Sequence, residues 1–378
     1  MSETVKVAIL GGSGFMGYDL ARTLHETDGF EPIVYSTSAK SLTNLARHDI
    51  DIRLVRYDDL KRTVLPKGVQ YLVNYAHPFG NREALSIKSQ ISVLADFMLR
   101  NLERYSQLRA IQVSSMSVYE PFEDDHEFLE SCELDPPRSD RYARSKCAFE
   151  TLLEEQSELA GRLMLLRPTV VYGPFCRPWT DALLAGFEAG DVSYQDLDGR
   201  IQPIVVSDVS RFIMDRFADF APGTFNLAGP ETMKWHDFLN FFGNVVSRGR
   251  LVESDTPPQT TSAKRAQTVR EVLGVAKGVL RDEKVKDLVR PVVSQLPAKL
   301  VETLKERLNS NLGSLARSVA EGGDPDGPFC EPFFAADRLV STRATQQQFP
   351  DAEFTRLDAS RDLLARYHSF RFRDEVLT

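Results

Sequence analysis

Short apolar runs alternate with amphipathic, helix-like stretches over the first 150 residues. The first run, Val5–Leu10, is followed by glycines and predicts a buried strand, and Tyr18–Glu26 then predicts a helix. Four more strands are expected in this part of the chain, at Pro32–Tyr35, Ile52–Tyr57, Tyr71–Tyr75 and Ala110–Ser114. Strands that alternate with helices are typical of right-handed βαβ units and a parallel sheet.

The strand pattern continues around Pro168 and weakens after Gly173. Met164–Leu166 and Thr169–Tyr172 are expected to extend the sheet towards its far edge, and Phe175–Trp179 is expected to form a loop over a cleft. Later segments with a recognisable pattern are two short strands and a helix, at Ile204–Val206, Phe225–Leu227 and Trp235–Val246. We therefore expect an α/β fold with a doubly wound parallel sheet of the Rossmann type. Residues 1–175 would form the dinucleotide-binding domain, completed by segments near 200–230, and residues 176–378 would mainly form a smaller substrate portion.

Residues 256–320 differ in character from the rest of the chain. They hold twelve Lys or Arg against six Asp or Glu, so this stretch carries about +6 and the remainder about -14. Two prolines open the stretch and the glycine-rich turn 322–327 closes it, which predicts a helical insertion. The basic excess is most simply a solvated face, and the alternative is a docking site for an acidic partner. The chain then returns through Phe333–Val340 to a last helix near Ala359–His368.

Composition narrows the class of protein. The 378 residues are 42% hydrophobic and 26% charged, which is ordinary for a globular protein, and no apolar run predicts a membrane span. The net charge of -8 argues against general nucleic-acid binding. The N-terminus enters a strand directly and predicts no signal peptide. The scattered cysteines and histidines predict neither a disulfide framework nor a metal site, which favours a cytoplasmic setting.

The first strand leads into a glycine-rich loop. Gly11, Gly14 and Gly17 satisfy GxxGxxG, and the same loop satisfies GxGxxG from Gly12. Such glycines permit a tight turn, close approach of backbone N–H groups to a pyrophosphate, and close packing of helix on strand. The loop lies between a predicted strand and a predicted helix, so we expect a dinucleotide site.

The end of the second strand bears on which dinucleotide binds. An Asp or Glu there often binds the ribose hydroxyls of NAD, but this chain continues as Tyr35-Ser36-Thr37-Ser38-Ala39-Lys40. Hydroxyls and a lysine suit a 2′-phosphate better than a carboxylate would, so Ser36, Thr37 and Lys40 favour NADP(H) over NAD(H). The alternative is that these residues form a solvated turn and that specificity lies elsewhere.

A second pattern predicts chemistry. Tyr142 and Lys146 are four residues apart and share one helix face, where the cation is expected to lower the tyrosine pKa. Such a tyrosine can exchange a proton with an alcohol or carbonyl while a hydride passes to or from nicotinamide. A strand rich in hydroxyls, Ile111–Tyr119, precedes the pair, and Arg167–Pro174 follows it.

With these motifs the sequence resembles the extended short-chain dehydrogenase/reductases, the NAD-dependent epimerase/dehydratase family. The glycine loop matches the cofactor loop, Tyr142 and Lys146 match YxxxK, and Ser115 falls on the catalytic Ser/Thr position. Arg167–Pro174 is similar to the "RP…YGP" segment, and Val206–Val209 and Gly223–Leu227 are similar to later family segments. The ordered matches cover roughly residues 5–245.

The resemblance implies roles for particular residues. Tyr142 would be the acid/base, Ser115 would bind the substrate oxygen, and Lys146 would tune Tyr142 and hold the nicotinamide ribose. The remaining cofactor contacts implied are Phe15, Met16, Asp58, Asp59, Tyr75, Ala76, Pro168 and Val170. The implied substrate contacts are Ser117, Phe175, Arg177 and Trp179.

This chain also departs from the family pattern. The usual second-strand acid is absent, and the helical insertion is not typical. The 4,6-dehydratases carry an Asp-Glu pair just after the catalytic Ser/Thr, where this chain has Met116-Ser117, which argues against dehydration. His77 is expected to be structural rather than a ligand contact, and Cys176 has no visible base and is expected to be inert.

These observations predict an NADP(H)-dependent oxidoreductase, a ketone reductase or alcohol dehydrogenase of a sugar-like or other polyfunctional small molecule. The first alternative is a nucleotide-sugar epimerase with tightly bound NAD, and the second is a dinucleotide-binding sensor without turnover. The resemblance implies a homodimer.

Overall fold

The computed structural model describes residues 4–37, 42, 44–77, 87–122, 126–138, 140–156, 161–194, 196–253 and 334–372. The chain divides into two compact units. The first comprises Met1–Val192, Leu197–Leu251 and Phe334–Thr378, and the second comprises Ser193–Asp196 and Val252–Phe333. The predicted helical insertion at 256–320 lies outside the described residues, as does Lys40.

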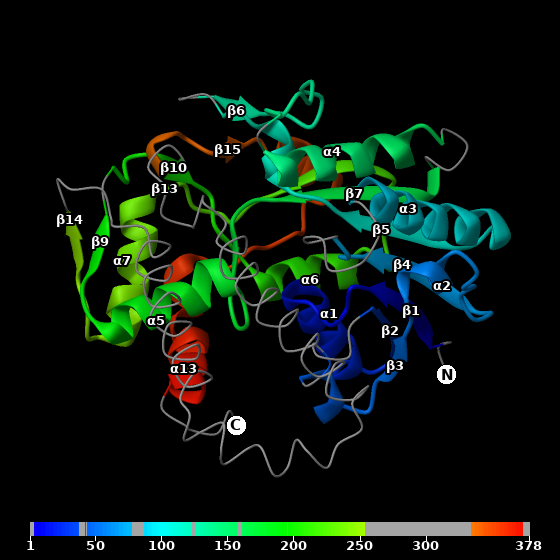
Figure 1. Ribbon diagram of the computed structural model, residues 1–378, viewed down its shortest axis with the longest axis horizontal. Helices are drawn as coiled ribbons and strands as arrows, with labels where there is room; N and C mark the ends of the chain where they lie inside the picture. Colours follow the sequence, from blue (N-terminus) through cyan, green and yellow to red (C-terminus); the bar gives the residue numbers. More distant parts are fainter. Residues whose placement is uncertain are drawn as a thin grey trace, which may run out of the picture. The chain divides into compact units, whose positions relative to one another are not determined.

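A seven-stranded sheet forms the centre of the first unit (Figure 1). Its strand order is β12-β7-β5-β4-β1-β2-β3, and every neighbouring pair is parallel. The strands are β1 (Val5–Leu10), β2 (Phe30–Ser36), β3 (Asp51–Leu54), β4 (Val69–Asn74), β5 (Arg109–Val113), β7 (Leu163–Pro168) and β12 (Gly223–Leu227). The order reverses between β1 and β4, so both carboxyl ends open at one switch point, where doubly wound sheets bind their ligands.

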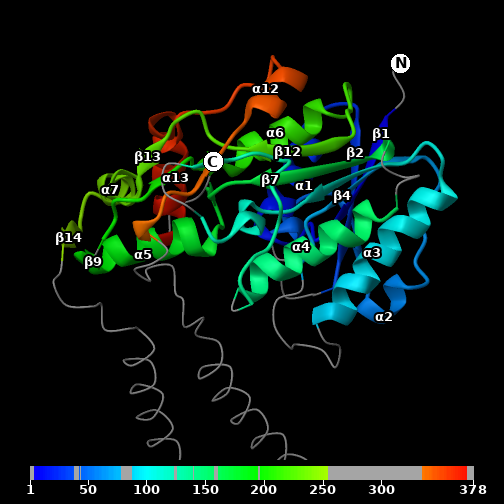
Figure 2. The ribbon, with the colours of Figure 1, turned by 90° about the horizontal axis from the view of Figure 1, so that it is seen from above.

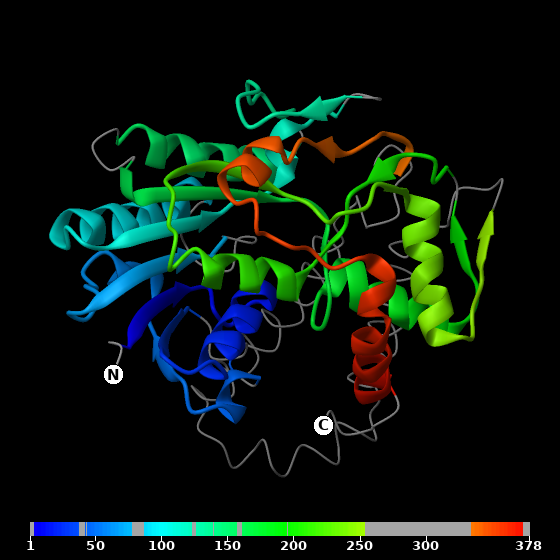
Figure 3. The ribbon, with the colours of Figure 1, turned by 180° about the vertical axis from the view of Figure 1, so that it is seen from behind.

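Helices cover both faces of the sheet. On one face α1 (Phe15–His25) packs against α6 (Val206–Asp215), and on the other lie α2 (Tyr57–Leu60), α3 (Ile87–Arg104) and α4 (Arg141–Glu154). Alternate residues of β1 serve the two cores: Val7 and Ile9 belong to the α1/α6 side, while Ala8 and Leu10 belong to the other. Figures 2 and 3 show the same layers from above and from behind. The predicted doubly wound fold is thereby confirmed.

The remaining elements of the described residues are helices and short strands outside this sheet. The helical ones are η2 (Leu45–Arg47), η3 (Met116–Tyr119), η5 (Arg177–Asp181), α5 (Ala182–Ala189), α7 (Trp235–Val246), α12 (Arg343–Gln348), η6 (Leu357–Ser360) and α13 (Arg361–Phe372). The strands are β6 (Glu127–Phe128), β8 (Val171–Tyr172), β9 (Val192–Tyr194), β10 (Arg200–Ile201), β11 (Ile204–Val205), β13 (Met233–Lys234), β14 (Leu251–Glu253) and β15 (Leu339–Val340). They pair two by two, as β10-β13, β11-β8, β14-β9 and β15-β6.

Several predicted boundaries are wrong. The third strand ends at Leu54, because Tyr57 turns inward and packs in the core as the first residue of α2. Val206 begins α6 rather than ending a strand. Thr169–Tyr172 does not extend the main sheet, because the chain leaves it after Pro168 and β8 pairs with β11 instead. The far edge strand is β12, which joins β7 along Gly223–Leu227.

The loop expected at Phe175–Trp179 is partly helical. Phe175 has a left-handed backbone, φ 68°, and Arg177–Asp181 then makes one π-helical turn. Pro178 fits the first turn because its missing N–H is not needed there. The buried Thr180 hydroxyl accepts from the backbone N–H of Gly173 at 2.9 Å, which holds the turn against the end of β8.

Candidate active site

The glycine loop closes directly on the end of β4. Gly11 has a left-handed backbone, φ 78°, and a methyl group added to it would lie 2.7 Å from the backbone nitrogen of Ala76. A methyl group added to Gly17 would lie 2.5 Å from the carbonyl oxygen of Gly11. Only glycine fits at both positions, so the loop makes a backbone-lined cradle at the N-terminus of α1. This cradle fits a dinucleotide pyrophosphate.

The end of β2 lies beside the same loop. The hydroxyl of Ser36 is 2.8 Å from that of Ser13, and Ser36 is buried while Thr37 is exposed. Ser36 therefore ties the strand to the glycine loop, and of the two described residues Thr37 is the one open to a ligand. Lys40, the third residue of this prediction, lies outside the described part of the chain.

The predicted acid/base lies at the start of α4. Asp140 caps this helix, because its carboxylate accepts from the backbone N–H of Ala143 at 2.8 Å. Tyr142 is 38% exposed and its side chain makes a hydrogen bond with Ser115, which follows β5. Ser115 in turn accepts from the backbone N–H of Ser117 at 3.2 Å. The structure thus brings together the predicted tyrosine and the predicted serine.

Lys146 lies one helical turn further along α4 and is buried. Its ammonium donates to the carbonyl oxygen of Val113 at 3.0 Å and stands 5.8 Å from the centre of the Tyr142 ring. Burial lowers the pKa of Lys146 to about 8, while the carboxylate of Glu150 raises it. The ammonium is therefore held at the end of β5, behind the tyrosine ring.

The expected direction of the Tyr142 pKa is not observed. Desolvation raises the pKa of Tyr142 above its ordinary value, and the hydrogen bond with Ser115 lowers it by less. The expectation failed because the Lys146 ammonium is directed at the Val113 carbonyl rather than at the phenol oxygen. The phenol therefore keeps its proton at neutral pH.

His77 lies among the predicted catalytic residues. Its Nε2 is 3.1 Å from the hydroxyl of Ser145, and its ring meets that of Tyr142 edge to face, with centroids 5.0 Å apart. Burial, assisted by the nearby Lys146, lowers the pKa of His77 to about 3, so the ring is neutral. The sequence predicts a purely structural role for this histidine, whereas the structure places its ring against that of Tyr142. Its position three residues beyond β4, at the sheet edge that binds ligands, was the signal available.

The other predicted cofactor residues are spread over several elements. Pro168 and Val170 are buried where β7 ends, and Phe15 and Met16 open α1. Asp58 and Asp59 are exposed in the first turn of α2.

Tyr75 contributes through its backbone. Its carbonyl carbon approaches Gly11, while its side chain packs in the core cluster beneath α1. Ala76, next in the chain, also meets the loop through its backbone nitrogen.

The predicted substrate residues take different positions. The hydroxyl of Ser117 accepts a hydrogen bond from the hydroxyl of Ser115 at 3.3 Å, and Arg177 is exposed. Phe175 packs edge to face between Tyr18 of α1 and Tyr367 of α13, at centroid distances of 5.3 and 5.2 Å. Trp179 lies against Trp235 of α7, with centroids 5.1 Å apart. Phe175 and Trp179 therefore pack as parts of the framework.

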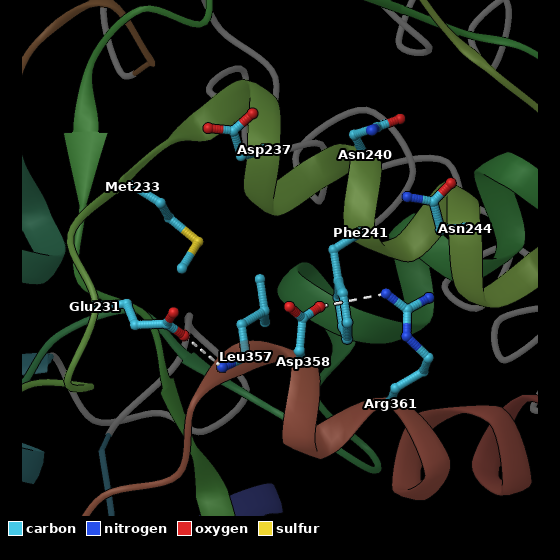
Figure 4. A pocket seen from close by; sticks show the side chains of 9 residues that line it. All are labelled: Glu231, Met233, Asp237, Asn240, Phe241, Asn244, Leu357, Asp358 and Arg361. Atoms are coloured by element: carbon cyan, nitrogen blue, oxygen red, sulfur yellow. Dashed lines mark hydrogen bonds and ion pairs between the residues drawn. The ribbon is translucent and has the colours of Figure 1, made fainter.

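A polar pocket of about 250 Å³ lies between α7 and the start of α13 (Figure 4). Its residues are Glu231, Met233, Asp237, Asn240, Phe241, Asn244, Leu357, Asp358 and Arg361. Four of its polar side chains are already engaged: Glu231 accepts from the backbone N–H of Leu357, Asp358 pairs with Arg361, and Asp237 lies 3.3 Å from His236 Nδ1. None of the predicted site residues lines this pocket.

Three further properties concern the described part of the chain. Burial raises the pKa of the Cys176 thiol to about 12, so it stays protonated. Among the described residues, no group of three or more His, Cys, Asp or Glu could hold a metal ion. Of the helices described, none is long and apolar enough to cross a membrane.

Comparison with protein families gives one match that bears on these residues. The model of the "NAD dependent epimerase/dehydratase family" matches residues 7–216, more than half of the chain, and spans the glycine loop, Ser115, Tyr142 and Lys146. The chain belongs to this family. It is an enzyme of the extended short-chain dehydrogenase/reductase type, so the alternative of a sensor without turnover falls away. A comparison with curated protein sequences gave no match.

Solved structures of this enzyme family share the fold. A dTDP-glucose 4,6-dehydratase from Bacillus anthracis, in complex with NAD, is 17% identical with a TM-score of 0.56, over 67% of this chain and 86% of that one. A UDP-glucose 4-epimerase from Thermus thermophilus, also with NAD, is 18% identical with a TM-score of 0.56, over 68% and 88%. A hypothetical dTDP-4-dehydrorhamnose reductase from Sulfolobus tokodaii is 15% identical with a TM-score of 0.50, over 68% and 88%.

Proposed function

We propose that this enzyme reduces a ketone of a sugar-like or other polyfunctional small molecule, using a nicotinamide dinucleotide. The observation that carries the proposal is the hydrogen bond between Tyr142 and Ser115, with Lys146 one turn away on the same helix. When bound, the dinucleotide supplies the hydride. The protein supplies the proton and the orientation of the substrate.

The roles of the side chains follow from their protonation and contacts. Tyr142 keeps its phenol proton at neutral pH, as tyrosine ordinarily does, and would give that proton to the substrate oxygen in the reductive direction. The Ser115 hydroxyl, fixed by the Ser117 N–H, would orient the substrate oxygen beside Tyr142. Lys146 would hold ribose hydroxyls of the dinucleotide with its buried ammonium.

We further propose a preference for NADP(H). Its support is the second-strand end, where Ser36 is followed by the exposed Thr37 and then by Lys40, with no carboxylate among residues 35–40. A 2′-phosphate needs cationic and hydroxyl partners and is repelled by a carboxylate. A cytoplasmic location, a homodimer and an acidic partner at residues 256–320 belong to the same proposal.

A nucleotide-sugar epimerase with tightly bound NAD is the second candidate. It is favoured by the family description and by the NAD named with several structural neighbours. An epimerase oxidises and reduces within one turnover, so it retains its cofactor. Dehydration is disfavoured, because Met116 and Ser117, the residues after Ser115, lack a carboxylate.

The deciding experiment is mass spectrometry of the dinucleotide released by denatured, freshly purified protein, followed by titration with NADPH and NADH. Empty protein that binds NADPH more tightly supports the reductase, and stoichiometric NAD supports the epimerase. Tyr142→Phe should then lower turnover of ketones at least about 100-fold without weakening dinucleotide binding.

Tyr105→Phe is the matched control for that variant. It also removes one phenol oxygen, which donates to the carbonyl of Leu65 at 2.8 Å, and Tyr105 precedes β5, whereas Ser115 follows it. Unchanged turnover in Tyr142→Phe would rule out Tyr142 as the acid.

A further inference from the structure

Two amide side chains lie buried side by side where β4 and β5 end. Asn74 and Gln112 are register partners across the two parallel strands, and both are at most 1% exposed. The Nδ2 of Asn74 donates to the Oε1 of Gln112 at 2.7 Å. Buried amides need partners for both their donor and their acceptor, so the surroundings of this pair define its orientation.

The hydrogen bonds of the pair run in one direction. The backbone N–H of Ala76 donates to the Oδ1 of Asn74 at 2.9 Å, which fixes the oxygen of that amide. The Nε2 of Gln112 donates to the carbonyl of Val113 at 2.9 Å, which fixes the nitrogen of the second amide. Reversing either amide would bring two donors or two acceptors together.

Both ends of this chain of hydrogen bonds reach the candidate active site. The Val113 carbonyl that accepts from Gln112 also accepts from the ammonium of Lys146 at 3.0 Å. The Ala76 nitrogen at the other end lies at the Gly11 cradle. The two amides therefore connect the lysine of α4 with the loop that precedes α1.

We infer that Asn74 and Gln112 are positioning residues, which hold the Lys146 ammonium and the Gly11 cradle in the mutual placement that dinucleotide binding needs. This inference rests on the proposed function. An apolar pair would fill the same space between the strands, but it would leave the Val113 carbonyl and the Ala76 N–H without these partners. Gln112 also shares the Val113 carbonyl with Lys146, so it limits how strongly that carbonyl binds the ammonium.

The test compares Gln112→Met with Asn101→Leu in the full chain. Asn101 is equally buried, in α3, and its amide also makes one accepting and one donating bond, with Leu65 and Phe97, at 2.9 and 2.8 Å. We expect Gln112→Met to weaken NADPH and NADH binding at least about tenfold in fluorescence titrations. Asn101→Leu should lose similar thermal stability and bind both dinucleotides within about twofold of wild type.

The pH dependence of binding gives a readout that a merely structural role would not move. In the described part of the chain, the titratable groups that face Lys146 are Tyr142 and Glu150 of α4 and His77 beyond β4. In the wild type, dinucleotide affinity should fall as the pH rises through about 8, where Lys146 loses its proton. Without Gln112 the Val113 carbonyl accepts more strongly from the ammonium, so this midpoint should move to higher pH.

Asn74→Asp is the second variant, in case Gln112→Met does not fold. An aspartate keeps the acceptor for the Ala76 N–H but loses the donor to Gln112, so we expect the same loss of affinity. If the wild type binds neither dinucleotide, both the proposed function and this inference are wrong. If wild type binds, but the Gln112 or Asn74 variant behaves as Asn101→Leu does, the inference alone is overturned.

Discussion

The ion pair between Glu150 and Arg167 offers a test with a large expected effect. Glu150 lies on α4, one turn beyond Lys146, and its carboxylate accepts from the Nε and Nη2 of Arg167, the latter at 2.7 Å. Their side chains are 1% and 3% exposed. Arg167 also donates to the Tyr119 hydroxyl at 2.8 Å, so the pair joins α4 to β7 and to the turn after β5.

Glu150→Gln should destabilise the protein by about 3 kcal/mol. Removing one partner of a buried ion pair typically costs about 3–5 kcal/mol, because the other charge stays buried without its counter-ion. The lower end applies, since glutamine still accepts one hydrogen bond from Arg167. The control is Glu31→Gln, which breaks the pair with Lys6, where the side chains are 38% and 45% exposed. Such exposed pairs contribute about 0–1 kcal/mol.

The assay is denaturant unfolding of both variants and the wild type, combined with dinucleotide titration over pH. The Glu150 carboxylate raises the pKa of Lys146, so Glu150→Gln should shift the pH midpoint of binding to a value below about 8. Glu31→Gln should leave that midpoint unchanged. A Glu150→Gln protein that loses no more stability than Glu31→Gln would refute the reasoning from burial.

Two further outcomes are expected. Gly17→Ala should weaken dinucleotide binding by about tenfold or more, because its methyl group would lie 2.5 Å from the Gly11 carbonyl oxygen. The control is Gly161→Ala, where the space is open and the dinucleotide titration should be unchanged. Equal affinities of the two variants would contradict this account of the cradle. His77 has a folded pKa of about 3 against 6.5 when unfolded, so its contribution to stability is present above pH 6.5 and is lost as the pH falls towards 3. His77→Gln should therefore lose less stability than wild type between pH 7 and 5 in urea unfolding, and an equally steep loss would show that other groups set the acid limit.

Much of the fold could be read from local patterns. Val5–Leu10 and Trp235–Val246 have the predicted bounds, because an apolar strand that ends at glycines and an amphipathic helix each carry a clear period. Boundaries failed where burial and local pattern disagree. Tyr57 continues the apolar pattern of the preceding strand, so the pattern extends the strand to this residue. In the structure Tyr57 instead begins α2 and packs in the core.

The sequence by itself determined the chemistry that depends on spacing along the chain. Gly11 and Gly17 define the cradle, and Tyr142 and Lys146 share a helix face, because these relations lie within one turn or one loop. Family membership follows from the same motifs and their order.

Only the tertiary structure decided how these parts meet. The contact of Tyr142 with Ser115, the ammonium of Lys146 at the Val113 carbonyl and the pairing of Asn74 with Gln112 join residues 27 or more positions apart. Local periodicity reports which face of an element is buried, but it does not report which strand lies beside which or in what register. Those choices come from packing the whole sheet, and they set the desolvation that raises the pKa of Tyr142 and lowers the pKa of Lys146.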